Sequence, residues 1–166
     1  MVDCLVDPKA VAECTSCTQT DVSTSIAAIN AGRLGAKRGA LSAIKKFKKA
    51  LKAQGVAFSK KDKAIEANIK KLFTSAQALV DSFPPSFSQC QNTVLCSSVF
   101  NDSKYDQLKT EVRYYFSKTK SFQGKLKKLV GSISKTDKQA LGKVKQATSA
   151  VVTGVDSLPR QYSICN

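Results

Sequence analysis

Two stretches of the chain, residues 58–91 and 133–166, are copies of one unit. They align without a gap when one is shifted by 75 residues, and 11 of the 34 aligned positions are identical. Each copy opens with Ser-Lys-x-Asp-Lys and closes with Val-Asp-Ser-x-Pro, followed by a cysteine six residues after the proline. Because a repeat of this length folds as one supersecondary unit used again, the duplication constrains the fold more than any other feature.

The repeats divide the chain into three segments. We expect an N-terminal cysteine-bearing segment at residues 1–17, a first helical hairpin at 18–90 and a second at 91–166, with the two hairpins packed as one domain. The first segment also contains the closing pattern, because Cys14 follows Pro8 by six residues. This third closure indicates a segment of a longer tandem array, or a duplication inside one.

Composition favours helices over strands. The 166 residues include only eight glycines and four prolines, while Ala, Lys, Leu and Val are abundant, as is typical of helical domains. We predict a first helix that begins at Asp21, with Thr20 as its N-cap, and runs toward Gly55. Three glycines interrupt its apolar spacing between residues 32 and 39. They predict either a kink or the close approach of a neighbouring helix.

The repeated unit supplies the second and fourth helices. Each begins at a Ser-x-x-Asp capping motif, Ser59 with Asp62 and Ser134 with Asp137, and each is stopped by proline. A third helix is expected to begin near Asn101 or Asp102. Because short connections make successive helices antiparallel, the sequence predicts an all-α, disulfide-stapled four-helix up-down bundle built from two duplicated helix hairpins.

Cysteine usage points to an oxidising compartment. Six cysteines, an even number, favour a disulfide framework and a secreted protein over free thiols in a cytosolic one. In an up-down bundle all the cysteine-bearing segments lie at one pole, and the duplication favours pairings that repeat. The predicted disulfides are Cys17–Cys90, Cys96–Cys165 and Cys4–Cys14, with a local Cys90–Cys96 bridge as the main alternative.

Neither a signal peptide nor a membrane span is visible. The first residues form neither a basic stretch nor an apolar run, so we expect a mature chain with an added starting methionine. No run of 18 apolar residues occurs, and no transmembrane segment is therefore predicted.

The residue types argue against an enzyme. The chain has no histidine, which removes Ser-His and Cys-His dyads and imidazole ligands for metal or haem. It has no phosphate-binding glycine loop, no dinucleotide-binding motif and no EF-hand. A single C-x-x-C without histidine does not make a zinc site. We predict a non-catalytic protein without metal or cofactor.

Positive charge is the strongest functional signal, and it is uneven. Of the net charge of +15, residues 1–32 carry −3, residues 33–71 carry +11 and residues 72–166 carry +7. Such a field attracts anionic surfaces or polymers, including acidic membranes, bacterial envelopes and sulfated glycans. The lysines expected to form the binding face are Lys45, Lys46, Lys48, Lys49, Lys52, Lys60, Lys61, Lys63, Lys70 and Lys71.

The predominance of lysine over arginine limits the classes of anionic partner. Lysines outnumber arginines 23 to 4, which suits diffuse electrostatics and disfavours nucleic acid, where bidentate arginine contacts are common. The competing interpretation is that a lysine-rich face only keeps a secreted bundle soluble.

Two other functions stay open. The first is a carrier of a small hydrophobic ligand, such as a lipid or fatty acid, held between the helices. The residues that would line such a space are Phe47, Phe73, Tyr105, Tyr115, Phe116 and Phe122, although aromatic residues at helical spacing also make an ordinary core. The second is a structural spacer repeat that links or coats.

One sequon for N-glycosylation occurs, at Asn101. It is a candidate glycan site if the host modifies secreted proteins, and a helix-capping residue otherwise. The sequence leaves the oligomeric state open.

Overall fold

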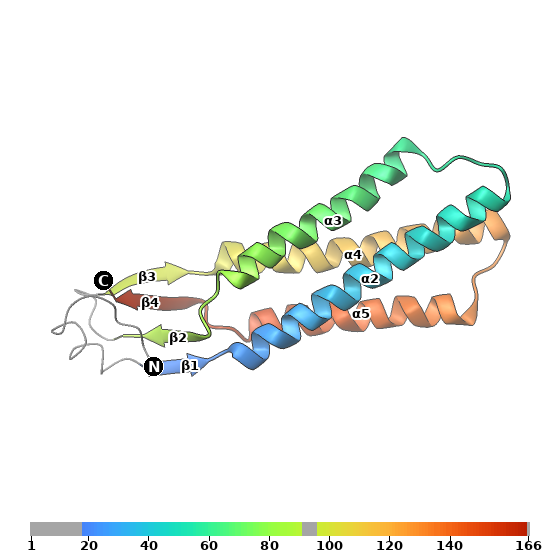
Figure 1. The fold of residues 1–166 in the computed structure, drawn as a ribbon. Coiled ribbons are helices and arrows are strands. Elements are labelled where there is room, and N and C mark those ends of the chain that lie inside the picture. Colours follow the sequence, from blue (N-terminus) through green and yellow to red (C-terminus); the bar gives the residue numbers. More distant parts are fainter. Residues whose placement is uncertain (1–17, 91–95, 166) are drawn as a thin grey trace.

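The computed structural model describes residues 18–90 and 96–165. Four long helices form an elongated bundle with short strands at one end (Figure 1). In chain order the elements are β1 (Thr18–Asp21), α2 (Ser23–Ala53), α3 (Lys60–Asp81), β2 (Ser86–Gln89), β3 (Cys96–Phe100), α4 (Asp102–Val130), α5 (Lys135–Asp156) and β4 (Gln161–Cys165). The prediction of a mostly helical chain with four helices is confirmed.

The strands are a correction to the all-α prediction. β1 pairs with β2 and β3 pairs with β4, each as a two-stranded antiparallel ribbon, and β2 also contacts β4. Sequence analysis predicted no strands, and it placed Thr20 and Asp21 of β1 at the start of the first helix; each strand has only four or five residues. Such short strands carry almost no periodic signal, and they form because each hairpin brings its two ends together. The structure is therefore two β-α-α-β units side by side.

Helix capping was predicted correctly for the two repeated helices and wrongly for the first. The Ser59 and Ser134 hydroxyls accept hydrogen bonds from the backbone N–H groups of Asp62 and Asp137, both at 3.1 Å. The first helix begins at Ser23 rather than Asp21, because Thr20 and Asp21 belong to β1. The Asp21 carboxylate instead accepts a hydrogen bond from the Ser23 backbone N–H at 2.9 Å. The helix predicted near Asn101 begins at the next residue.

The four helices do not pack equally. α2 and α4 contact each other across the centre of the bundle, and α5 packs closely against both of them. α3 contacts α2 and α4 less, and in Figure 1 it diverges from α4 toward the end away from the strands. The bundle is therefore tight around α2, α4 and α5 and more open along α3.

Glycines explain why α5 lies so close to α2. α2 continues from Ser23 to Ala53, so the predicted break does not occur and the alternative, close helix approach, is confirmed. A Cβ atom on Gly32 would lie 2.6 Å from a methyl group of Val151, and one on Gly39 would lie 2.1 Å from a methyl group of Val144. Both valines are buried. The absence of a side chain at these glycines is what allows the contact.

The two units bury equivalent positions along their first helices. A shift of 79 residues places Ser23, where α2 begins, on Asp102, where α4 begins. The position pairs buried in both are Val22/Asn101, Ile29/Leu108, Arg33/Val112, Ala36/Tyr115, Ala40/Thr119, Ala43/Phe122, Ile44/Gln123 and Phe47/Leu126. Equivalent burial in both units is what the predicted duplication requires.

The same shift explains why α3 packs more loosely than α5. It places Gly32 and Gly39, which admit α5, on Glu111 and Lys118 of α4. We infer that α4 therefore lacks the glycines that would admit α3 to equally close contact. The result is a groove of about 630 Å³ between these two helices, lined in part by Glu111.

None of the helices within residues 18–90 and 96–165 is both long enough and apolar enough to cross a membrane.

We predict that Gly39→Ala destabilises the bundle by about 1–3 kcal/mol, because the new methyl group overlaps the buried Val144. Gly142→Ala is the matched control: it is also helical, but no atom lies within 4 Å of its added Cβ. The control should gain up to about 1 kcal/mol from helix propensity. Urea unfolding followed by circular dichroism measures both, and equal effects of the two substitutions would contradict the close packing of α2 on α5.

Candidate anionic-surface interface

Charge is separated along the long axis of the bundle. We call residues 39–70 and 117–145 the basic half, because they are the helical halves and connections farther from the strands. This half carries 18 lysines against three carboxylates, a net charge of +15. The remaining described residues form the strand half, which carries eight Lys or Arg against six carboxylates, a net charge of +2. The molecule therefore presents one strongly cationic end.

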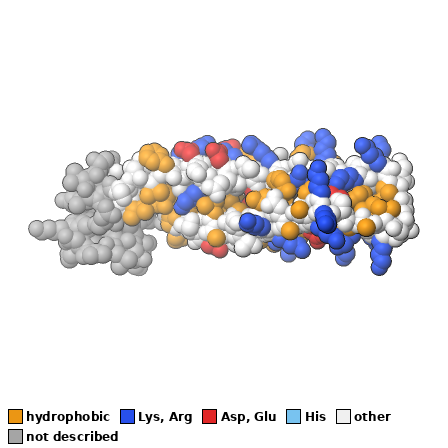
Figure 2. All heavy atoms as spheres, turned by 90° about the horizontal axis from the view of Figure 1, so that it is seen from above, with side chains coloured by type: hydrophobic (Ala, Val, Ile, Leu, Met, Phe, Trp, Pro, Cys, Tyr) orange, Lys and Arg blue, Asp and Glu red, His pale blue; other side chains and the backbone are white. Residues whose placement is uncertain are grey.

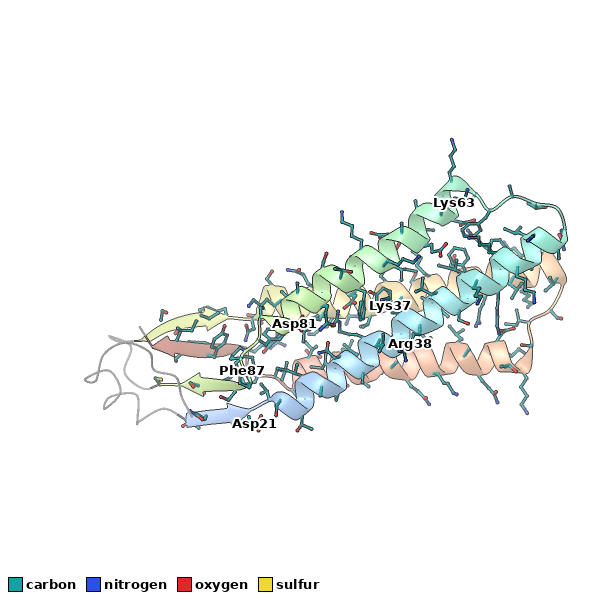
Figure 3. The ribbon with its side chains drawn as sticks, viewed as in Figure 1. Asp21, Lys37, Arg38, Lys63, Asp81 and Phe87 are labelled. Atoms are coloured by element: carbon teal, nitrogen blue, oxygen red, sulfur yellow. The ribbon has the colours of Figure 1, made fainter. Side chains whose placement is uncertain are left out.

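The pictures agree with this separation. In Figure 2, lysine and arginine side chains are denser over the end farther from the grey segment. Figure 3 shows Lys63 projecting outward near the start of α3, whereas Asp21 and Asp81 lie toward the strands. Sequence analysis found net positive charge in residues 33–71 and in residues 72–166, but took the predicted binding face from residues 33–71 alone. The structure shows that the end of α4 and the start of α5 lie at the same pole, and residues 117–145 contain nine lysines, as many as residues 39–70.

The three carboxylates of the basic half are each engaged by one lysine. Asp62 pairs with Lys125 and Asp137 pairs with Lys46, so each helix-capping aspartate is bound by the other unit. The pKa of Asp137 is lowered, first by the hydrogen bond from Lys46 and then by that from Ser134. The third carboxylate, Glu66, pairs with Lys70 on the same helix. Within the described residues no other lysine of this half forms an ion pair.

All ten lysines predicted for the binding face are exposed. Nine of them lie on the last half of α2 and the first half of α3, on either side of the connection at residues 54–59, and Lys71 lies just beyond, in the strand half. Two of the ten, Lys46 and Lys70, are the partners in ion pairs just described. The other eight present their charge to solvent.

A groove of about 740 Å³ runs beside the end of α2. Gly55 turns the chain there with a φ of +69°, and the backbone N–H of Val56 donates to the Leu51 carbonyl at 3.0 Å. We call it the lysine groove; its lining residues are Lys45, Lys48, Lys49, Lys52, Gly55, Val56, Ala57 and Phe58. Its walls are therefore cationic and its remaining surface is apolar or backbone.

Phe58 lines the lysine groove and connects it to the hydrophobic core. Its ring packs edge-on against Phe47, with ring centroids 6.5 Å apart, and the Lys48 ammonium lies 5.3 Å from its centroid. This contact places a lysine over an aromatic face. It also ties the connection to the core, because Phe47 is buried.

Sequence analysis missed a second basic groove, of about 510 Å³, on α4. Lys120, Lys125 and Lys128 line it together with Ser117, Ser121 and Gly124. The duplication contained the signal for it, since the shift of 79 residues places Lys46, Lys48 and Lys49 on Lys125, Lys127 and Lys128. Sequence analysis aligned the repeat only over residues 58–91 and 133–166, so it did not include this equivalence.

Sequence analysis also missed a buried ion pair at the centre of the bundle. Arg33 Nε lies 2.6 Å from Glu111 Oε2, and the side chains are 0% and 2% exposed. Arg33 had been counted with the cationic surface. Its guanidinium also donates to Asn30 at 2.7 Å and to the Phe73 carbonyl at 3.2 Å. No periodic pattern identifies such a pair, because each residue alone resembles a surface charge.

The aromatic residues predicted to line a ligand space are dispersed through the core. Tyr105, Tyr115 and Phe122 are fully buried, and Phe47 packs against Phe122 with centroids 5.7 Å apart. Burial raises the pKa of Tyr105 to about 12. Burial, with the hydrogen bond to Glu111, also raises the pKa of Tyr115.

The other two aromatic residues of that set are half-buried. Phe73 and Phe116 pack against the core cluster nearer the basic half. The Lys37 ammonium lies 3.7 Å from the Phe73 ring centroid. None of the six predicted residues lines any of the three grooves described above.

Asn101, the predicted glycan site, is fully buried. Its side-chain amide donates to the Tyr105 hydroxyl at 3.2 Å and to the Pro159 carbonyl at 3.4 Å. It precedes α4 without making a side-chain cap bond. A glycan on this nitrogen does not fit the folded chain, because the nitrogen is enclosed and already donates both its hydrogens.

Of the predicted disulfides, Cys4–Cys14 lies wholly outside the described residues, as does Cys17 of the pair with Cys90. Cys96 and Cys165 face each other as Cα partners at the end of the β3–β4 ladder. At the equivalent end of the other ribbon, Thr18 is the partner of Gln89, and these are the chain neighbours of Cys17 and Cys90.

The described residues contain no cluster of three or more His, Cys, Asp or Glu side chains that could hold a metal ion. Comparisons with protein-family models, with curated proteins and with solved structures find no match for this chain. The charge distribution and the grooves of the chain itself are therefore the basis for a functional proposal.

We predict that Glu111→Gln destabilises the protein by about 3–5 kcal/mol, because it leaves the buried Arg33 cation without a counter-charge. Glu66→Gln removes the carboxylate that pairs with Lys70, which is more exposed than that of Glu111, and should lower the free energy of unfolding by less than about 1 kcal/mol. The double variant Arg33→Met with Glu111→Leu should recover much of the loss. Urea unfolding measures all three, and a small effect of Glu111→Gln would contradict the structural role of the pair.

Proposed function

We propose that this chain is a secreted, basic, non-enzymatic binding protein that attaches to anionic surfaces or polymers through its basic half. The observation that carries the proposal is the separation of charge, a net +15 in one half against +2 in the rest of the described residues. Charge that served solubility alone would need no such separation, and interspersed signs would serve it better. A one-ended field instead attracts and orients an anionic partner.

The chemistry of the basic half suits many weak contacts. All 18 of its cations are lysines, and the four arginines of the chain lie in the strand half. Lysine acts as a hydrated point charge on a flexible stem, whereas arginine makes the planar, bidentate contacts used in specific phosphate and base recognition. We therefore infer binding to a surface or polymer of distributed negative charge, with affinity that falls as salt rises.

The alternative functions receive less support. A carrier needs an open space among the aromatic residues, but Phe47, Tyr115 and Phe122 belong to one packed cluster. The groove between α3 and α4 has the volume for a small ligand and a mostly apolar lining, but none of the six aromatic residues predicted to hold a ligand lines it. A spacer repeat would not account for the concentration of lysines at one pole.

The proposal of a secreted protein rests on the cysteines. Cys90 is disulfide-bonded, and Cys96 and Cys165 are opposite each other in an antiparallel ladder. Directly opposed residues in such a ladder have Cα atoms about 4.5–5.5 Å apart, which is within the range that a disulfide spans. We propose that Cys96–Cys165 and Cys17–Cys90 close the two units in equivalent ways.

Peptide mapping without reduction tests this pairing. We expect one linked peptide containing Cys96 and Cys165 and another containing Cys17 and Cys90. The strand register favours these pairings, because one ribbon ends at Cys96 and Cys165 and the other ends at Thr18 and Gln89, the chain neighbours of Cys17 and Cys90. A peptide linking Cys90 to Cys96 would support the local alternative, and six free thiols in protein from its natural source would contradict secretion into an oxidising compartment.

Lysine substitutions test the binding function. Replacing Lys45, Lys48, Lys49 and Lys52 with Gln should weaken binding to phosphatidylglycerol vesicles and to immobilised heparin by about 100-fold or more at low salt, because each lysine near an anionic surface contributes about 1 kcal/mol. The dependence of binding on salt should become shallower. Co-sedimentation measures binding to the vesicles, and retention on the heparin column measures binding to heparin, each at several salt concentrations.

The matched control for this experiment removes the same charge from α5. Lys135, Lys138, Lys143 and Lys145 are all exposed, and none forms an ion pair among the described residues. The α5 variant should bind more tightly than the lysine-groove variant, although both have lost four charges. Equal losses of affinity in the two variants would show that binding depends on net charge alone. If the wild-type protein binds neither vesicles nor heparin, the proposed function is wrong.

A further inference from the structure

The tip of the basic half carries two exposed valines among its lysines. Val56, in the α2–α3 connection, and Val130, the last residue of α4, are each 49% exposed. The helix ends that carry the two valines are neighbours, because the Gln54 side-chain amide donates a hydrogen bond to the Leu129 carbonyl at 3.2 Å. The other exposed large hydrophobic residues of the described chain are Phe100 at 65% and Ile164 at 45%, and both belong to the strands at the opposite end.

The backbone holds both valines at turns. Gly55 precedes Val56 with a φ of +69°, and Gly131 follows Val130 with a φ of +81°. These left-handed conformations are accessible to glycine and strained for other residues. They let α2 and α4 stop abruptly, so that each valine lies at the end of the bundle rather than on its side.

Lysines surround the two valines. Lys52 lies in the last turn of α2, and Lys127 and Lys128 lie in the last turn of α4. Val56 itself lines the lysine groove beside Lys48 and Lys49. An apolar tip within a cationic rim complements the anionic headgroups and the acyl boundary of a membrane surface.

We propose that the partner of the basic half is an anionic phospholipid bilayer, bound end-on with Val56 and Val130 inserted among the headgroups. This inference rests on the proposed function and names its partner. A sulfated glycan or other hydrophilic polymer offers counter-charge to the lysines, but no apolar region for the valines. A bilayer interface offers both, and this difference selects the membrane.

The separation of charge sets the orientation. The field of the basic half turns this end toward the membrane, and the six carboxylates of the strand half are kept away from it. With 31 residues rising 1.5 Å each, α2 would hold the strand ribbons about 45 Å from the headgroups. The cysteine-bearing pole then faces outward from the surface.

A single tryptophan reports insertion directly, since the chain contains none. In Val56→Trp, phosphatidylglycerol vesicles should shift the fluorescence emission to shorter wavelength, and heparin should not. The matched control is Ile164→Trp, because Ile164 is 45% exposed at the opposite pole. It should show no shift with either probe. Equal shifts at both positions, or none in a Val56→Trp protein that still sediments with vesicles, would overturn end-on insertion.

A second pair of variants measures the energetic contribution of the valines. The double variant Val56→Ser with Val130→Ser should bind these vesicles about 10-fold more weakly, because it loses apolar burial in the interface. Its retention on heparin should change far less than its vesicle binding, and the control Ile164→Ser should equal wild type in both assays. If the double variant binds vesicles as tightly as wild type, the inserted tip is wrong while the proposed function stands. If wild type binds neither probe, both proposals fail.

Discussion

The buried ion pair between Arg33 and Glu111 is the constraint on which the rest of the bundle depends. It lies between two hydrophobic clusters, one near the strands and one in the basic half. The Tyr115 hydroxyl donates to Glu111 at 2.7 Å, and the Arg33 guanidinium reaches the Phe73 carbonyl, so the network joins α2, α4 and α3. Since an unpaired charge here would be costly, the pair selects one register among these helices rather than adding much net stability.

The same pair connects the packing of the bundle to its asymmetry. Glu111 occupies the position in α4 that Gly32 occupies in α2. Glycine admits α5 to close contact with α2, whereas the glutamate needs room and a counter-charge from across the bundle. Two units of one design therefore pack differently: α5 is tightly held and α3 is looser. The groove between α3 and α4 is a consequence of this difference rather than evidence of a ligand.

Sequence reasoning succeeded where a local rule decides the structure. The Ser-x-x-Asp motifs gave the starts of α3 and α5, and the small residues of α2 gave its close contact with another helix. It failed where the outcome depends on long-range pairing. The strands exist because each hairpin brings its ends together, and Arg33 is buried because Glu111 lies opposite it in space, 78 residues away in the chain. Half of the basic interface was missed for the same reason.

The direction of the helices explains why the charge gathers at one end. α2 and α4 both run away from the strands, so lysines in the last half of each helix reach the same pole (Figure 1). Such crowding of like charges opposes the compact state. The bundle offsets it only in part, because three ion pairs engage three of the 18 lysines in this half. The anionic surface that we propose as the partner would supply the counter-charge and relieve the remaining repulsion, and a partner that binds only the folded state would also stabilise it. Under that proposal, the arrangement that weakens the isolated bundle is the one that would drive its association.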